Sequence, residues 1–136
     1  MQTPKFLSVE EVLKLHQDQI DSFGGTPGVR DRRLLEAALT QPQIRLGGKL
    51  LHPRIYEQAA AYLYHLAMSY PFVDGNKRTA FAVMDTFIRL HGCSLDLTND
   101  QAYELVMQLV KGKLSQDRLI TYLEKAIVDV VLYQRF

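Results

Sequence analysis

Residues 70–80 read Tyr-Pro-Phe-Val-Asp-Gly-Asn-Lys-Arg-Thr-Ala, a stretch that predicts a turn between two buried helices. Pro71 stops the preceding helix, and Gly75 gives the chain the freedom to enter the next one. N–H groups at a helix start have no partner within the helix and carry partial positive charge, so they attract anions. Further donors follow at Asn76, Lys77 and Arg78. Asp74 can hold Mg²⁺ against the same anion, so the stretch predicts a phosphate-binding turn.

The composition predicts one domain with a local electrostatic site. The chain has 136 residues, 47% of them hydrophobic, which suits a single domain over residues 1–136. A formal net charge of +1 argues against a general nucleic-acid binder, so we expect no direct nucleic-acid binding. The single cysteine, Cys93, excludes an internal disulfide, and neither a signal peptide nor a membrane-spanning run is evident. We expect a cytoplasmic protein without membrane contact.

Capping and stop signals divide the chain into about six helices. They predict helices over residues 9–23, from Asp31 to near Pro42, over residues 55–69 and 75–91, from Thr98 to about Lys111, and from Ser115 to about Leu132. Pro53 suits the first position of the third helix. The first helix is predicted to bury Val12, Leu13, His16 and Ile20, and the second to bury Leu34, Leu35, Ala38 and Leu39.

Strand signals are nearly absent, and residues 94–97 are the only candidate strand. Residues 43–52 are predicted to form an irregular loop, with Gly47 and Gly48 giving a flexible flap. The predicted fold class is therefore all-α, a compact single-domain helical bundle with short connections.

The order and spacing of residues 70–80 resemble the signature of the Fic/Doc superfamily, His-x-Phe-x-Asp/Asn-x-Asn-Lys/Gly-Arg. Lys77 in place of glycine resembles the death-on-curing branch, and so does the early loop Phe-Gly-Gly-Thr-Pro-Gly-Val-Arg-Asp at residues 23–31. The resemblance implies a magnesium-dependent transferase that moves part of ATP, or of another nucleoside triphosphate, onto a hydroxyl of a target protein. Members of this branch are similar to toxins that phosphorylate a translation elongation factor and are silenced by an antitoxin.

The resemblance also implies a role for each side chain of the turn. Phe72 would anchor the turn in the core, and Asp74 would hold magnesium. The phosphates would be bound by Gly75, Asn76, Lys77 and Arg78. Lys77 stands where the AMP-transferring branch has glycine, which favours delivery of the terminal phosphoryl group over AMP. The family's self-inhibiting motif is missing, so we expect silencing by an antitoxin segment that folds as a helix into an apolar groove.

Tyr70 occupies the position where the family keeps its general-base histidine. A tyrosine with a pKa of about 10 is almost wholly protonated at neutral pH, and loss of a general base typically costs about 100- to 10,000-fold in rate. The chain is therefore predicted to be impaired. Three interpretations stay open. Tyr70 is a detoxifying replacement, belongs to a natural divergent member in which it is activated by neighbouring cations or is itself modified, or marks a pseudoenzyme that only binds nucleotide or antitoxin.

Ordinary structural roles compete with these assignments. Asp74 is also a typical helix cap, and Lys77 with Arg78 is also a typical solvated pair. His65, the only histidine on the predicted helix before the turn, is predicted to be packed or hydrogen-bonded. The charge cluster at residues 30–33 is either an exposed helix start or a docking site for an acidic partner. A helix-turn-helix DNA-binding regulator is disfavoured, because no basic recognition face is present.

Overall fold

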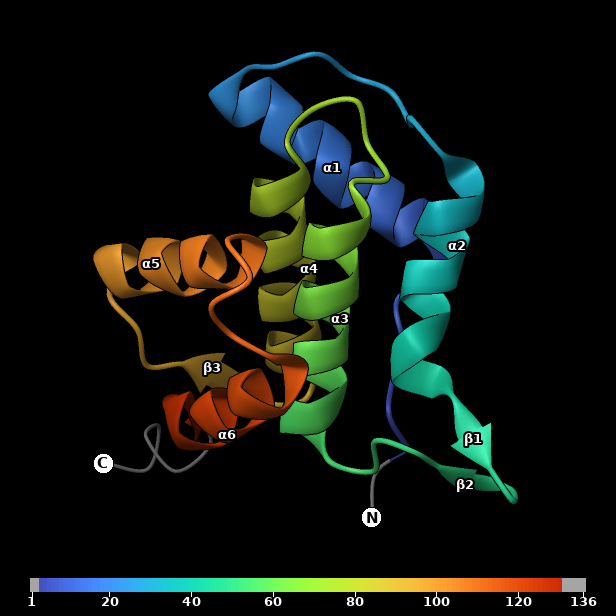
Figure 1. The fold of residues 1–136 in the computed structure, drawn as a ribbon, viewed down its shortest axis with the longest axis vertical. Helices are drawn as coiled ribbons and strands as arrows, with labels where there is room; N and C mark the ends of the chain where they lie inside the picture. The colour runs from blue at the N-terminus through green and yellow to red at the C-terminus, as the bar shows by residue number, and fades with distance from the viewer. Residues whose placement is uncertain (1–2, 131–136) are drawn as a thin grey trace.

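The structure, a computed structural model, describes residues 3–130 as six α-helices and two small antiparallel sheets (Figure 1). The helices are α1 Val9–Phe23, α2 Arg32–Thr40, α3 Ile55–Ser69, α4 Asn76–Leu90, α5 Asn99–Val110 and α6 Gln116–Ala126, with a 3-10 turn η1 at Gln41–Gln43. The strands are β1 Arg45–Leu46, β2 Lys49–Leu50, β3 Cys93–Leu95 and β4 Ile127–Asp129. The predicted all-α class and the predicted number of helices are confirmed.

Local capping determines where most helices begin. The hydroxyl of Ser8 accepts the N–H of Glu11, and the Glu11 carboxylate accepts the N–H of Ser8, which makes the predicted capping box. Thr98 and Gln101 repeat this arrangement at α5, while Asp31 and Ser115 cap α2 and α6. These four predicted starts are therefore confirmed.

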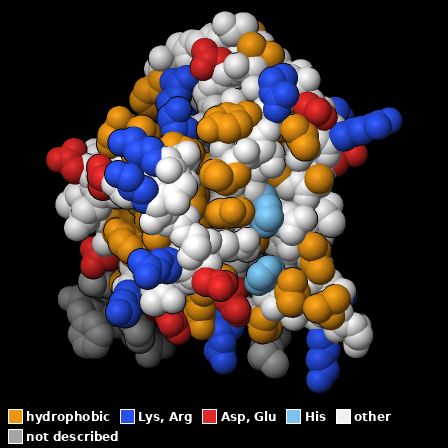
Figure 2. Space-filling model, viewed as in Figure 1, with side chains coloured by type: hydrophobic (Ala, Val, Ile, Leu, Met, Phe, Trp, Pro, Cys, Tyr) orange, Lys and Arg blue, Asp and Glu red, His pale blue; other side chains and the backbone are white. Residues whose placement is uncertain are grey.

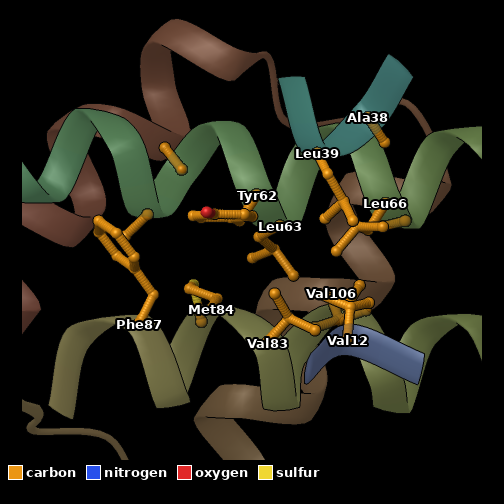
Figure 3. Close-up of a cluster of buried hydrophobic side chains, with 14 of the residues drawn as sticks. Val12, Ala38, Leu39, Tyr62, Leu63, Leu66, Val83, Met84, Phe87 and Val106 are labelled. Carbon is orange, nitrogen blue, oxygen red and sulfur yellow. The ribbon is translucent and has the colours of Figure 1, made fainter. Parts of the chain in front are cut away.

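The core lies between α3 and α4, which run antiparallel through the middle of the molecule (Figure 1). Figure 3 shows Tyr62 and Leu63 of α3 pointing toward Met84 and Phe87 of α4. The ring of Tyr62 lies 5.0 Å from that of Phe87, and its hydroxyl accepts the N–H of Leu7 at 2.9 Å. One core cluster includes residues of all six helices. The two helices that flank the turn between α3 and α4 are therefore rigidly packed.

Helix α2 ends at Thr40, close to Pro42 as predicted, and Pro42 lies in η1, because a proline has no N–H to continue an α-helical ladder. Two other details of the helices differ from the predictions. Leu34 is 36% exposed, since only the narrower stripe of Leu35, Ala38 and Leu39 faces the core. Pro53 lies before α3, whose N-cap is Arg54.

The structure contains more strand than the sequence predicted, in two short antiparallel sheets. Residues 45–50 form the hairpin β1–β2, and Gly47 and Gly48 supply the two positive φ angles, 58° and 81°, that suit a tight hairpin turn. The predicted irregular loop is therefore wrong. The candidate strand is confirmed as β3, which spans Cys93–Leu95 rather than residues 94–97, but its partner β4 falls where the last helix was predicted to continue. The β-branched pair Ile127 and Val128 favours that strand, while the predicted helix end at Leu132 lies outside the described residues.

The arrangement brings two distant loops together at one end of the molecule. The turn between α3 and α4 lies beside the segment that joins α1 to α2, while the β1–β2 hairpin lies at the opposite end (Figure 1). On the face seen in Figure 2, cationic and anionic side chains are interspersed with hydrophobic ones, and no broad area carries one sign. Within residues 3–130, no helix is both long enough and apolar enough to cross a membrane.

Candidate functional site

The turn between α3 and α4 is anchored by a buried ring pair. Phe72 is buried, and its ring stacks on the imidazole of His16 with centroids 3.9 Å apart and planes at 6°. The Nε2 of His16 lies 2.8 Å from the carbonyl oxygen of Asp74, so Nε2 carries the proton and donates. The anchoring role predicted for Phe72 matches this position. His16 was predicted only as a core residue, and the one signal for more was a polar side chain on the inner face of α1.

Asn76 shapes the turn from the inside. Its side-chain oxygen accepts the N–H of Phe72 at 2.9 Å, and its side-chain nitrogen donates to the carbonyl of Phe72 at 3.0 Å. The amide is therefore engaged with the main chain of the turn. The donor that Asn76 can offer to an anion is its main-chain N–H, in the first turn of α4.

Asp74 links the turn to the early loop, residues 23–31. Its Oδ1 accepts the N–H of Gly75 at 2.8 Å, and its Oδ2 accepts the N–H of Thr26 at 3.1 Å. These two main-chain hydrogen bonds, that from Thr26 first, hold the pKa of the Asp74 carboxyl below its ordinary value. The side chain is exposed, so the other lone pairs of the carboxylate remain accessible.

Helix α4 begins without a side-chain cap. Its N-cap is Gly75 in the left-handed region, with φ 74° and ψ 21°, and no side chain accepts a hydrogen bond from the first-turn N–H groups. The alternative that Asp74 caps these groups is therefore not what the structure shows, because its carboxylate accepts from Gly75 and Thr26 instead. A Cβ at position 75 would also lie 3.3 Å from Ile20 Cδ1. The start of α4 thus keeps open the anion-binding donors of a helix N-terminus.

The two cations of the turn differ in their surroundings. Lys77 is exposed and lines a neighbouring pocket. Arg78 donates from Nη2 to the carbonyl of Gly24 at 2.9 Å, and its guanidinium lies 5.8 Å from the centre of the Phe23 ring. Arg78 therefore ties α4 to the early loop while it keeps further N–H donors beside the helix start.

The early loop pairs with the turn along its length. The N–H of Val73 donates to Gly28, and Val29 and Phe72 form an antiparallel bridge. Arg30 extends the contact, because its guanidinium donates to the carbonyls of Ser69 and Tyr70. Neither interpretation of the charge cluster at residues 30–33 anticipated this role for Arg30.

Comparison with known proteins agrees with this geometry. Residues 6–88 match the Fic/DOC family, a span that contains α1, the early loop, the turn and most of α4. The chain belongs to this family.

Two relatives place it more closely within the Fic/DOC proteins. A protein named Toxin Doc from Mycolicibacterium smegmatis is 42% identical over 90 residues, which cover 65% of this chain and 69% of the relative. Protein kinase doc of Escherichia phage P1 is 30% identical over 111 residues, which cover 82% of this chain and 86% of the relative. Both carry the name Doc, which supports the resemblance to the death-on-curing branch.

Tyr70, which the sequence resemblance aligns with the family's histidine, has an unusual backbone. It ends α3 with φ 50° and ψ 55°, and it is the one non-glycine residue with positive φ among residues 3–130. Its side chain is 45% exposed.

His65 lies five residues before Tyr70, about 140° round the helix. Its ring contacts Tyr64 edge-on, and burial lowers its pKa, so the prediction of a packed histidine is confirmed.

An apolar pocket of about 440 Å³ opens beside the start of α4. Lys77 and Arg78 are among its lining residues, and α5 forms one of its walls. Its apolar lining comes from Phe23, Phe81, Ala102, Tyr103, Val106 and Met107. The α5 wall lies beyond the segment that matches the Fic/DOC family.

Proposed function

We propose that this chain is the toxin of a toxin–antitoxin module and transfers the terminal phosphoryl group of a nucleoside triphosphate to a hydroxyl of a target protein. A translation elongation factor is the target class that the family resemblance suggests. The observation that carries the proposal is the uncapped start of α4, with Lys77, Arg78 and Asp74 beside it. Transfer of AMP from the same nucleotide is the alternative reaction at this site.

The phosphates would bind at the N–H groups of the first turn of α4, with Lys77 supplying positive charge from its exposed position. The target hydroxyl attacks the terminal phosphorus, the bond to the bridging oxygen breaks, and the nucleoside diphosphate leaves. The hydroxyl proton must pass to a base. Position 70 is where the family supplies one, and Tyr70 is a poor substitute at neutral pH.

The residues present fit a magnesium ion held through Asp74. The carboxylate is exposed, its lowered pKa keeps it ionised, and only two of its lone pairs accept main-chain N–H groups. Within residues 3–130, no three His, Cys, Asp or Glu side chains gather around one point. One carboxylate suffices, because Mg²⁺ usually takes its other ligands from substrate phosphates and water. When bound, Mg²⁺ would neutralise phosphate charge as the bond to the leaving group breaks.

A second function, a catalytically inactive module that binds nucleotide or antitoxin, is favoured by Tyr70 itself. The start of α4, the Asp74 carboxylate and the apolar pocket can each bind a ligand without a base at position 70. A chain with this residue can therefore keep its ligand and lose the transfer step. Binding without transfer is the signature of this alternative.

The partner we propose is an antitoxin whose amphipathic helix fills the apolar pocket beside α4. The pocket is large enough for a few side chains, and its exposed aromatic residues Phe23 and Tyr103 are typical anchors for a helix. Lys77 and Arg78, which also line the pocket, favour acidic residues on that helix. A helix in this position would also hinder the nucleotide. We place the module in the cytoplasm, where the translation machinery is found.

The deciding experiment compares this chain with its Tyr70→His variant. Each is incubated with a target extract, magnesium and ATP labelled either at the terminal or at the alpha phosphorus. We expect terminal label on a protein with Tyr70→His, weaker label with Tyr70, and loss of label when Asp74→Asn is added. Asp100→Asn, at the start of α5, is the matched control and should leave labelling unchanged. Label from the alpha position alone would establish AMP transfer, and calorimetric ATP binding without any label in either chain would establish the inactive module.

A further inference from the structure

Residue 70 is held in a conformation that its side chain does not favour. Left-handed backbone angles are uncommon outside glycine, and among other residues they are enriched in Asn, Asp and His rather than in bulky aromatics. Tyr70 nevertheless has φ 50° and ψ 55°. Pro71 after it disfavours the right-handed helical region at residue 70 but leaves the extended region open. Something else must keep the chain out of the extended conformation.

Arg30 contacts the three peptide groups around this position. Its Nε donates to the carbonyl of Tyr70 at 2.6 Å, and its Nη2 donates to the carbonyl of Ser69 at 2.9 Å. Its own main-chain N–H donates to the carbonyl of Pro71 at 2.8 Å. These carbonyls lie at the negative end of α3, where no helical N–H is left to pair with them, so a cation is favoured there.

The backbone that carries Arg30 is held in place by the residues before and after it. Before Arg30, Val29 pairs with Phe72 in an antiparallel bridge. After it, the N–H of Asp31 donates to the carbonyl of Pro71, and its carboxylate caps α2. The fork of Arg30 is therefore presented from a backbone that is held both to the residues after position 70 and to the start of α2.

We infer that Arg30 is a positioning residue, whose guanidinium holds residue 70 in the left-handed conformation and thereby determines where the side chain of residue 70 points. The planar fork is required, because two successive carbonyls must be reached at once. A lysine ammonium on a flexible chain has no such fork. That this direction matters for transfer rests on the proposed function, whereas the hold on the backbone does not.

The test uses the full chain with either Tyr70 or Tyr70→His, each combined with Arg30→Gln, Arg30→Lys or the control Arg33→Gln. Arg30 is exposed, so its variants should fold. Arg33 lies in the same charge cluster and makes no side-chain hydrogen bond or ion pair with the residues that the structure describes. The first readout is the Cα and Cβ chemical shifts of residue 70, which report its backbone angles without any ligand. The second is the kinetics of phosphoryl transfer from terminally labelled ATP.

We expect Arg30→Gln to move the shifts of residue 70 toward extended values and Arg33→Gln to leave them unchanged, with Arg30→Lys in between. In the Tyr70→His chain, Arg30→Gln should lower kcat by about 10- to 100-fold and change KM by less than about threefold, because a misdirected base hinders the chemical step rather than binding. A merely structural role for Arg30 would not lower kcat selectively while KM stays nearly unchanged.

Unchanged shifts in Arg30→Gln would overturn the inference, whatever the activity. Shifted signals with unchanged kcat in the Tyr70→His chain would overturn the positioning role. If no chain transfers phosphate at all, the proposed function fails, but shifted signals would still establish that Arg30 holds the turn.

Discussion

The carboxylate of Asp74 accepts the main-chain N–H of Thr26 at 3.1 Å, across 48 positions of sequence. This hydrogen bond joins the only acidic side chain of the turn to the early loop. The same carboxylate is the one that we propose for magnesium. The shape of the early loop and the affinity for a magnesium–nucleotide complex should therefore depend on each other.

Gly25→Ala tests this dependence directly. A Cβ at position 25 would lie 2.8 Å from Asp74 Oδ2, on a backbone with φ 123° that side chains rarely adopt. We expect the carboxylate to be displaced, the free energy of unfolding to fall by about 1–3 kcal/mol, and the affinity for magnesium and ATP to fall with it. Urea unfolding and calorimetry measure the two effects.

Gly24→Ala is the matched control for that substitution. Position 24 also has a positive φ, 85°, but nothing lies within 4 Å of its added Cβ. It should show the backbone strain without the displacement of Asp74. Equal losses of nucleotide affinity in the two variants would contradict a role for the position of Asp74.

Acidification should open the same contact. The pKa of Asp74 is lowered below its ordinary value of 3.8 because the charged carboxylate accepts the N–H groups of Thr26 and Gly75. The stabilisation is therefore fully present above pH 3.8 and is lost as the pH falls through the lower, folded-state pKa. The amide resonance of Thr26 should shift in this acidic range, and in Asp74→Asn it should not. A midpoint at or above the ordinary pKa would show that the hydrogen bonds do not favour the ionised form.

What could be predicted from the sequence was mostly local. The capping box of Ser8 and Glu11 lies within four residues and fixes the start of α1 without help from the rest of the chain. The turn was recognisable for a similar reason, because its proline, glycine and cations all lie within residues 71–78. Helix ends and helix starts were therefore placed within about two residues in most cases.

What could not be predicted depends on pairs that are distant in sequence. The strand Ile127–Asp129 forms because Cys93–Leu95 lies beside it, and only the packed bundle brings the two together. The hydrogen bonds of Arg30 to Ser69 and Tyr70 are of the same kind. His16 was assigned to the core correctly, but its contact with Asp74 required the fold.

Tyr62 should make the stability of the fold sensitive to alkaline pH. Burial raises the pKa of its phenol to about 12 from an ordinary 10.0, because the anion is poorly solvated there. The neutral form is thus favoured in the folded state, and stability is lost as the pH rises from 10 toward 12. Tyr62→Phe should weaken this alkaline loss, seen as a flatter dependence of the unfolding free energy on pH.

The same substitution removes the acceptor of a buried hydrogen bond. Without the hydroxyl, the N–H of Leu7 loses its partner, so Tyr62→Phe should destabilise the fold by about 1–3 kcal/mol at neutral pH. Tyr122→Phe, on the 37% exposed Tyr122 of α6, should change the neutral-pH stability little. If both variants unfold alike at neutral pH, the hydrogen bond to Leu7 does not contribute.

The proposed antitoxin site predicts that Tyr103 can be changed without harm to the fold. Tyr103 is 67% exposed on α5 and lines the apolar pocket, so Tyr103→Asp should leave the unfolding free energy within about 0.5 kcal/mol of its original value. Binding of the antitoxin should weaken by about 2 kcal/mol or more, since a buried aromatic anchor becomes a charge. Calorimetry with the proposed antitoxin measures the loss.

Tyr122→Asp is the control for that loss, because Tyr122 lines a different surface hollow, on α6. In cells that produce the Tyr70→His chain, Tyr103→Asp should restore growth arrest in the presence of antitoxin, whereas Tyr122→Asp should not. The contrast isolates the pocket from any general effect of a surface charge. If antitoxin binds Tyr103→Asp with its original affinity, the helix docks elsewhere, and the pocket beside α4 is then left to the nucleotide alone.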